Sequence, residues 1–398
     1  MDSSITTNSN SDQLRTKRII SLDMLRGLVM VLMVLDHVRD FFTNVRFQPT
    51  DLTKTNIPLF LTRWVTHLCA PTFIFLAGVA AYLYFENRLQ TKQELSQYLI
   101  IRGLWLVFLE LTIVRFGWTF EPTYSFSLAG VLWAIGWSMV VLAALVRMPI
   151  TLIASFVIVL ICGHNLFDQI HVEQLGRWGW LWAILHEPKR LMLFANKNLF
   201  IGYPLIPWIG VMATGYAFGT FMKQEKSLRQ QLFLRLGLGL IAGFVVIRAI
   251  NIYGDPSPWT VQNNFSFTIL SFINCQKYPP SLLYLLITLG IAMLLLYLFE
   301  KYRFRIFQPL VLFGQVPLFF YIFHLWMIHL AAILLALPKY GLKAINLPFI
   351  VSSRMPSDYG YDLPMIYNFW IIMIILLYPI CSWFRSYKAQ HSRKLPSN

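Results

Sequence analysis

The chain has 398 residues, of which 57% are hydrophobic and 13% are charged, and its mean hydropathy is +0.58. A soluble domain has about 45–50% apolar and about 25% charged residues, so this composition excludes a soluble globular protein and indicates a multi-pass membrane protein. The formal net charge is +15, but Lys and Arg occur in short clusters between apolar runs, as topology determinants do, so we expect no nucleic-acid partner.

The apolar segments follow a short polar start. Residues 1–17 are rich in Ser, Asn and Thr, which predicts a disordered cytoplasmic tail. A membrane-spanning helix needs about 20 mostly apolar residues. Ten stretches meet this requirement: 19–43, 59–85, 98–117, 128–147, 149–167, 199–222, 231–251, 279–300, 308–335 and 365–384. No linker divides them, so we predict an all-α, polytopic transmembrane bundle in one domain at 18–388, with a cytoplasmic tail at 389–398.

The positions of Lys and Arg predict the orientation of the bundle. Short loops with an excess of Lys and Arg stay in the cytoplasm. Every second loop counted from the N-terminus has such residues, namely Arg88 and Lys92, then Arg147, then Lys223, Lys226 and Arg229, then Lys301, Arg303 and Arg305. The alternate loops are longer and mix both signs. We therefore predict ten spans with both termini in the cytoplasm.

The first span ends in a charged run, "DHVRD". In the predicted orientation, Asp36, His37 and Asp40 lie near the outer end of this helix. Asp23 and Arg26 lie near its inner end. Ionisable residues are costly within the membrane and usually face a cavity or one another. Helical residues about 3.6 positions apart share a face, so one stripe of the helix joins the two groups. We expect this stripe to line a polar cavity.

Asp23 and Arg26 allow two interpretations. They are three positions apart, which suits an ion pair on the helix surface or an arginine that reaches the membrane interface. Alternatively, Arg26 binds a phosphate or carboxylate that enters from the cytoplasm, because its planar guanidinium donates in a fixed fork. Glu110, in the middle of the third span, is a candidate partner of Arg26.

His37 and His67 are the candidate catalytic bases. Neutral histidine accepts protons near pH 7, and both residues lie at a similar predicted depth below the outer surface. Asp40, one turn from His37, is expected to orient its ring, and Asp36 to keep the surroundings polar. Pro71 should bend the second span just below His67. The alternative is a hydrogen-bonded polar pair in the core. No histidine spacing typical of metal sites occurs, so we expect no metal.

Two later motifs combine proline with aromatic residues. "YPLIPW" opens the sixth stretch and "QKYPPS" the eighth, where proline in a first helical turn and interfacial Tyr and Trp are ordinary. We interpret both mainly as helix starts, with a share in the cavity rim as the alternative. His324 shares a helix face with Pro317 and Tyr321. His324 is equally consistent with a residue that packs in the core and with one that binds a ligand at the cavity rim.

Several of these stretches resemble one family. The stretches "RIISLDMLRGLVMVLMVLDHVRDFF" and "FLTRWVTHLCAPTFIFLAGVAAYL" are similar to bacterial membrane proteins related to heparan-alpha-glucosaminide N-acetyltransferase. The same holds for "VLWAIGWSMV", "GHNLFD", "YPLIPWIGVMATGYAFG" and "KYPPSLLYLLITLG". The likeness covers nearly the whole chain. The residues that match the family's L-D-x-x-R-G and P-x-F-x-F-x-x-G motifs are Asp23, Arg26 and Gly27, and Pro71, Phe73, Phe75 and Gly78.

The resemblance implies a fold and an activity. Relatives are multi-span bundles that transfer an acetyl group from cytosolic acetyl-CoA to an amino sugar across the membrane. It therefore implies the lipid bilayer, acetyl-CoA and a sugar or glycan acceptor as partners, in a bacterial cytoplasmic (inner) membrane, and it leaves a homodimer open. On this basis Arg26 and Asp23 would bind the CoA part of the donor. The catalytic group would consist of His67, His37, Asp40 and Asp36.

One position departs from the family pattern. The animal enzymes have Asn where this chain has His37, and their catalytic histidine lies in the loop that follows. Residues 38–66 contain no histidine here. Either His37 or His67 takes that role, or the chemistry differs. The resemblance therefore does not determine which sugar is acetylated.

Three functions compete on the sequence. An acyltransferase needs a cytoplasmic entrance for acyl-CoA, an outer acceptor pocket and a histidine between them. A proton-coupled transporter would also have protonatable residues, but inverted repeats, which favour that class, are not evident. A non-catalytic glycan- or lipid-binding protein needs no tunnel. We therefore expect a narrow tunnel that reaches both faces near His37 and His67.

Overall fold

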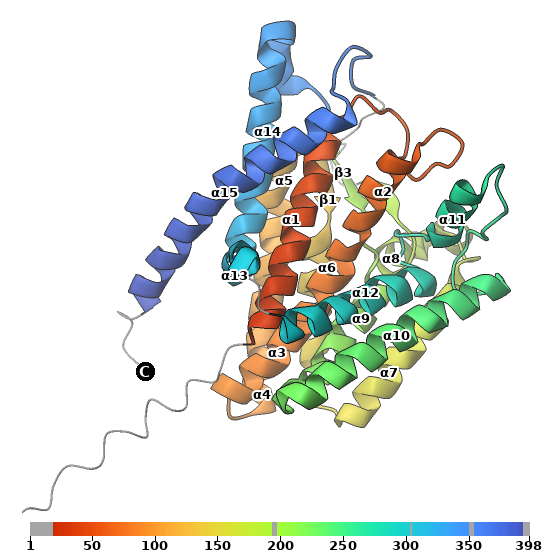
Figure 1. Ribbon diagram of the computed structural model, residues 1–398, viewed down its shortest axis with the longest axis vertical. Coiled ribbons are helices and arrows are strands. Elements are labelled where there is room, and N and C mark those ends of the chain that lie inside the picture. The colour runs from red at the N-terminus through yellow and green to blue at the C-terminus, as the bar shows by residue number, and fades with distance from the viewer. Residues whose placement is uncertain (1–18, 193–196, 303–304, 350–353, 393–398) are drawn as a thin grey trace, which may run out of the picture.

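The computed structural model describes residues 19–192, 197–302, 305–349 and 354–392 (Figure 1). These residues are mostly helical. The predicted tail at 1–17 lies outside the described residues. The last described residues, up to Ser392, continue the final helix, so the beginning of the second predicted tail is helical.

The elements of the first half of the chain are α1 (Ile20–Phe42), α2 (Ile57–Val65), η1 (Thr66–Leu68), α3 (Cys69–Arg88), α4 (Lys92–Leu109), η2 (Glu110–Val114), α5 (Arg115–Thr119), β1 (Phe126–Ala129), α6 (Val131–Leu145), α7 (Ile150–Gly163), η3 (His164–Phe167), η4 (Val172–Trp178), α8 (Gly179–Leu185), β2 (Lys189–Met192) and β3 (Asn198–Ile201). Those of the second half are α9 (Leu205–Gly219), η6 (Thr220–Lys223), α10 (Lys226–Ile250), α11 (Phe265–Ile273), α12 (Leu282–Lys301), η7 (Arg305–Phe307), α13 (Gln308–Gln315), α14 (Pro317–Tyr340), η8 (Gly341–Asn346) and α15 (Leu363–Ser392). Here η2 is a π-helical turn and the other η elements are 3-10 turns.

Each of the ten apolar stretches is helical over most of its length, although the stretches 128–147 and 199–222 begin in the strands β1 and β3. Seven helical segments among the described residues are long and apolar enough to cross a membrane. Helix α6 is shorter, and α1 and α4 carry charged residues within their apolar parts. The structure therefore supports a multi-pass membrane protein. The count of ten spans and their orientation remain predictions.

Helix α1 lies in the interior of the bundle (Figure 1). It contacts α3, α12, α13, α14 and α15. One continuous cluster of buried apolar side chains draws on helices from α1 to α15. Because neighbouring helices surround α1, its charged residues can face internal cavities instead of lipid. The boundaries of the predicted domain, 18–388, remain a prediction.

Glycine allows α1 and α13 to cross at very short range. A Cβ atom on Gly27 would lie 1.9 Å from the carbonyl oxygen of Leu310, and one on Gly314 would lie 2.0 Å from the carbonyl oxygen of Asp23. Gly78 gives the same close approach between α3 and α9, at 2.1 Å. Small residues let helix backbones approach in this way inside membranes. The final glycine of each motif noted in the sequence therefore serves helix packing.

The second apolar stretch breaks at His67 itself, slightly earlier than the bend expected at Pro71. The 3-10 turn η1 separates α2 from α3, and Pro71 lies in the first turn of α3, where proline is well tolerated. Proline has no N–H to donate to the carbonyl oxygen four residues earlier, which belongs to His67. The hydroxyl of Tyr284 donates to that oxygen instead, at 2.8 Å. The tertiary structure thus satisfies the carbonyl group that Pro71 leaves free.

A small sheet corrects the prediction of an all-α fold. Strand β3 pairs in parallel with β1 and antiparallel with β2, in the order β1-β3-β2. Ala129 and Ile201, the last residues of β1 and β3, are fully buried. Each strand is only four residues long, and β1 and β3 overlap the beginnings of the stretches predicted as spans at 128–147 and 199–222, so the apolar pattern did not distinguish them from helix. The sheet forms one wall of the cavity described below.

The two ends of the bundle differ in chemistry, and we call them the basic end and the loop end. Arg88, Lys223, Lys226 and Arg229 lie together at the basic end, beside the start of α1. The loop end holds α2, α8, α11 and the sheet (Figure 1). In the same view, α1 begins and α15 ends toward the basic end. This arrangement agrees with termini on one side, and which side faces the cytoplasm remains a prediction.

Buried polar contacts hold the loop before α12 in place. Nη2 of Arg248, which is only 1% exposed, donates to the carbonyl oxygen of Asn274 at 2.9 Å. Oδ2 of Asp255 accepts from the backbone N–H of Gln276 at 2.8 Å and from the hydroxyl of Ser281 at 2.6 Å. The segment between Asn274 and Ser281 is therefore anchored at both ends.

Candidate functional site

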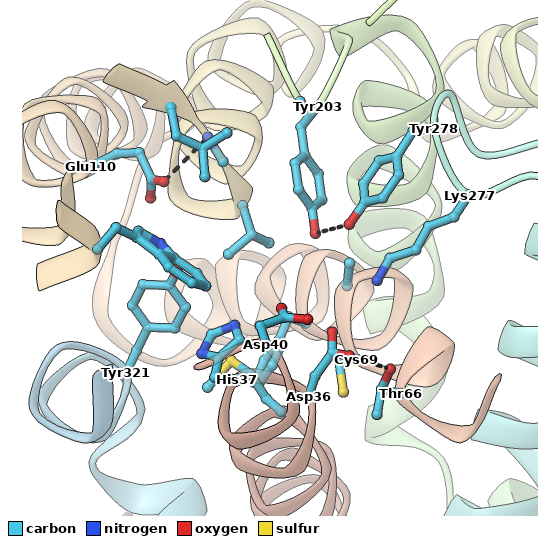
Figure 2. A pocket seen from close by; sticks show the side chains of 18 of the residues that line it. Asp36, His37, Asp40, Thr66, Cys69, Glu110, Tyr203, Lys277, Tyr278 and Tyr321 are labelled. Carbon is cyan, nitrogen blue, oxygen red and sulfur yellow. Dashed lines mark hydrogen bonds between the residues drawn. The ribbon is translucent and has the colours of Figure 1, made fainter. Parts of the chain in front are cut away.

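A central cavity of about 260 Å³ lies between α1, the α2–α3 segment, the sheet and the loop before α12 (Figure 2). Its polar and charged lining residues include Asp36, His37, Asp40, Arg63, Thr66, Glu110, Tyr203, Lys277, Tyr278 and Tyr321. Figure 2 shows the side chains of α1 on one side of this space and those of Tyr203, Tyr278 and Lys277 on another. Three of the four predicted catalytic residues, Asp36, His37 and Asp40, therefore line one cavity.

His324 determines the tautomer of His37. Nδ1 of His324 lies 2.9 Å from the carbonyl oxygen of Phe320, and because a carbonyl only accepts, this nitrogen carries a proton. In the neutral pair, Nε2 of His324 then accepts from Nδ1 of His37, at 2.8 Å. Nε2 of His37 keeps its lone pair, and no residue in the described ranges hydrogen bonds to it. The result is a ring nitrogen able to accept a proton on the cavity wall.

The carboxylate of Asp36 is engaged in ion pairs. Nη1 of Arg63 lies 2.6 Å from each of its oxygens, and Nη2 of Arg39 lies 2.8 Å from Oδ1. The hydroxyl of Thr66 donates to Oδ1 at 3.0 Å. These bonds join α1 to the α2–η1 segment. They balance the charge of Asp36 and hold this wall of the cavity in place.

Asp40 pairs with Arg39, not with His37 as expected. Nη2 of Arg39 lies 2.6 Å from Oδ1 of Asp40, and Nδ1 of His37 is taken by His324 from α14. The sequence placed Asp40 one turn from His37 on the same helix, but it could not show that a different helix supplies a closer partner. Asp40 remains 39% exposed and lines the cavity.

His67 lies apart from this wall. Its side chain is buried in η1 and packs against Tyr284, with ring centroids 5.4 Å apart, and it is not among the described residues that line the cavity. Depth along the helices suggested that His37 and His67 form a pair. The break at η1 turns the neighbouring Thr66, Cys69 and Ala70 toward the cavity instead.

Glu110 caps a helix, whereas the sequence suggested it as a partner of Arg26. Its two carboxylate oxygens accept from the backbone N–H groups of Gly130 and Leu132, each at 3.2 Å, at the start of α6. Acidic side chains are favourable at a helix N-terminus, where N–H groups lack helical partners. A Cβ on Gly130 would lie 2.3 Å from Glu110 Oε1, so glycine makes room for the contact.

The sequence did not single out Lys277, but the share in the cavity rim that was the alternative for "YPLIPW" and "QKYPPS" is present, because Tyr203, Lys277 and Tyr278 line the cavity. Lys277 lines the cavity although its side chain is buried, and Tyr278 and Tyr203 lie beside it with their hydroxyls 3.4 Å apart. Burial alone raises the pKa of the Tyr278 hydroxyl, but the positive charges of Lys277 and Arg63 outweigh it and hold that pKa below its usual value. A lysine in a loop predicted to be external, next to the membrane, was the signal that could have identified it.

Two further pockets lie between the central cavity and the basic end. The first, of about 310 Å³, is mostly apolar and shares Phe73, Val131 and Tyr321 with the central cavity. The second, of about 750 Å³, shares Arg26, Ala80 and Tyr84 with the first. We call them the middle pocket and the basic-end pocket. Adjacent spaces thus lead from the basic end to His37.

The basic-end pocket contains the predicted donor-binding residues. Five Lys or Arg residues and two carboxylates line it: Arg26, Arg88, Lys223, Lys226 and Arg229, and Asp23 and Glu300. Nη1 of Arg26 donates to Asp23 at 3.3 Å and to the carbonyl oxygen of Gly314 at 3.1 Å. The ion pair expected from the i,i+3 spacing is present, and Arg26 also lines both pockets at their junction.

A fourth space adjoins the central cavity at the loop end. It measures about 350 Å³ and shares Pro188 and Tyr278 with the central cavity. Its lining includes His186, whose Nε2 lies 3.1 Å from Asp168, and Gln276. We call it the loop-end pocket. Four adjoining spaces therefore extend from the basic end to the loop end.

The fold and these spaces define a polytopic helical membrane protein with a chain of internal cavities and a histidine pair near its middle. The model of the family described as "Heparan-alpha-glucosaminide N-acetyltransferase, catalytic" matches residues 18–257, which is more than half of the chain. The protein belongs to this family, as the motifs in the sequence indicated. No curated protein matches the chain.

Proposed function

We propose that the protein is a membrane acetyltransferase that moves an acetyl group from cytosolic acetyl-CoA to a sugar or glycan acceptor on the other side of the membrane. The family supports acetyl transfer in general. One observation carries the proposal for this chain: a series of pockets, each sharing lining residues with the next, extends from a basic pocket at one end past His37 to the other end. A non-catalytic binding protein has no need of such a route.

The donor side of the route suits acetyl-CoA. The phosphates of CoA require cations, and the basic-end pocket has an excess of Lys and Arg. Arg26 would bind the CoA part where the two pockets meet, and Asp23 would hold the Arg26 side chain in place. The apolar middle pocket would admit the uncharged arm that carries the thioester. The acetyl group would then arrive beside Tyr321, at the edge of the central cavity.

His37 would act as the general base. Its Nε2 would take the proton from the acceptor's amine or hydroxyl while the freed lone pair attacks the acetyl carbonyl carbon. The carbon–sulfur bond then breaks, and the leaving sulfur of CoA receives that proton from His37. His324 keeps the other ring nitrogen protonated throughout. Asp36 and Asp40 would contribute by balancing Arg39 and Arg63 around the reacting groups.

The first test measures transfer of labelled acetyl from acetyl-CoA to glucosamine and to glucosamine 6-phosphate by the purified protein. His37→Ala should lower the rate at least about 100-fold, the usual contribution of a positioned base. His67 is the second candidate base, and we expect the loss to be larger at His37 because His37 lines the cavity. Full activity in the His37→Ala protein would rule out this mechanism.

A matched pair of substitutions tests the route. Ala80 lines both the basic-end and the middle pocket, whereas Ala144 is an exposed alanine of α6 that lines neither. Ala80→Trp should stop transfer by filling the junction, and Ala144→Trp should leave the rate unchanged. Equal rates in the two variants would contradict passage of the donor through these pockets.

A further inference from the structure

Lys277 differs from the other buried cations of the described chain. The buried Lys and Arg side chains there are Arg39, Arg115, Arg248 and Lys277. The three arginines each have a carboxylate within ion-pair distance. Lys277 has none among the described residues, although it is only 8% exposed. Figure 2 shows its ammonium group directed into the central cavity.

A buried ammonium group without a counter-ion is costly, because burial removes water from a compact, strongly hydrated charge. The carboxylates nearby do not meet this need. Asp36 already pairs with Arg39 and Arg63, and Asp40 pairs with Arg39. The anchored loop between Asn274 and Ser281 holds Lys277 in the cavity. The site is therefore built to present one positive charge to a ligand.

The position of Lys277 indicates which ligand it meets. The central cavity adjoins the middle pocket, with which it shares Phe73, Val131 and Tyr321, and this is the donor side in the proposed function. It adjoins the loop-end pocket, with which it shares Pro188 and Tyr278, and Tyr278 directly follows Lys277 in the chain. Lys277 therefore lies at the acceptor side. The neighbouring rings of Tyr203 and Tyr278 offer apolar faces with hydroxyl tips, a combination that suits a sugar ring.

We propose that the acceptor is an anionic saccharide and that Lys277 binds its carboxylate or phosphate group. A negative oxygen of the saccharide would be the counter-ion of the Lys277 ammonium group. The charge-assisted hydrogen bond between them is stronger than one between neutral groups. The sugar ring would then lie against Tyr203 and Tyr278. That this ligand is acetylated rests on the proposed function, whereas its binding does not.

The test measures binding by calorimetry to the purified full-length protein, with no acetyl-CoA present. The probes are D-glucuronate, glucose 6-phosphate and neutral glucose, so that carboxylate and phosphate are distinguished from each other and from the bare sugar. At least one charged probe should bind about 10-fold or more tightly than glucose. Lys277→Met should abolish that preference, and Lys277→Arg should retain part of it. Lys54→Met, which changes an exposed loop lysine (62% exposed side chain), should leave it intact.

The outcomes separate this proposal from the proposed function. Lys277→Met removes an unpaired buried charge, so the variant should fold and melt at an equal or higher temperature. Equal affinity for charged and neutral probes in the unchanged protein would overturn the proposal. So would a Lys277→Met variant that keeps the preference, or one that slows acetyl transfer to a neutral sugar without changing probe binding. A lack of acetyl transfer would overturn the proposed function alone.

Discussion

The hydrogen bond between His37 and His324 decides which nitrogen of His37 can accept a proton. The chain of donors runs from His37 Nδ1 to His324 Nε2, and from His324 Nδ1 to the carbonyl of Phe320. Because the carbonyl oxygen can only accept, His324 Nδ1 must donate to it, and His324 Nε2 is then left to accept from His37 Nδ1. In the proposed mechanism, His324 would therefore be a positioning residue that acts through His37, and it does not itself line the described cavity.

Substitution of His324 tests this positioning. In His324→Ala, Nδ1 of His37 loses its acceptor, so the ring can both rotate and adopt the tautomer that carries its proton on Nε2, and the two effects together should lower kcat about 10-fold or more, part of the contribution of the base. In His324→Gln, the amide oxygen can accept from His37 Nδ1–H and the amide nitrogen can donate to Phe320. We expect Gln to restore most of kcat, with KM similar in both variants. The measurement is steady-state acetyl transfer.

Similar kcat values for the two His324 variants would contradict the positioning role. Thermal unfolding of both proteins serves as the control, because His324 is also 1% exposed and part of the core. A purely structural residue would lower kcat in proportion to the unfolded fraction. A His324→Leu variant distinguishes the two explanations, because Leu fills a volume similar to that of Gln but cannot accept from His37, so it should stay as slow as Ala.

Among the elements, the pairing of α1 with α13 helps to hold Arg26 where the basic-end and middle pockets meet. Gly27 and Gly314 allow the two backbones to meet, and the carbonyl of Gly314 then accepts from Arg26. The same contact brings α14, which directly follows α13, to α1, where His324 meets His37. A disturbance at Gly27 should therefore affect both ends of α1.

Two glycine substitutions compare a crowded helix position with an open one. Gly27→Ala places a Cβ 1.9 Å from the backbone of Leu310, so it should lower the free energy of unfolding by about 1–3 kcal/mol or prevent folding. Gly239→Ala in α10 meets no atom within 4 Å and should be neutral or stabilising by about 0.4–1 kcal/mol. Thermal unfolding in one detergent checks both. Comparable melting temperatures would refute the close crossing.

For the whole molecule, we predict that the basic and loop ends face opposite sides of the membrane. The positive-inside rule predicts that the basic end faces the cytoplasm, the side from which the proposed function requires acetyl-CoA to enter. Reporter fusions after Asn263, at the loop end, should read as external, and fusions after Lys301 should read as cytoplasmic. Asn263 is in an exposed loop and Lys301 ends α12, so neither insertion interrupts a helix. Two reporters on one side would refute the orientation.

Local patterns in the sequence determined the class of the protein and the position of its helices. Runs of about 20 apolar residues predict spans without knowledge of their neighbours, since each helix satisfies its own backbone hydrogen bonds. All ten stretches are helical over most of their length for this reason, and two of them begin in short strands. The charged stripe of α1 also predicted a cavity, because charges avoid lipid, and Asp36, His37 and Asp40 do line one.

Only the tertiary structure decided which partners these residues meet. His324 and His37 are 287 positions apart, and no local period relates them. Asp40 pairs with Arg39 where the sequence suggested His37, and Glu110 accepts from the start of α6 where the sequence suggested Arg26. Lys277 entered the cavity because distant buried contacts anchor its loop. Helix rotation, close crossings and loop anchoring arise from the packing of the whole chain, so a reading of one segment at a time cannot contain them.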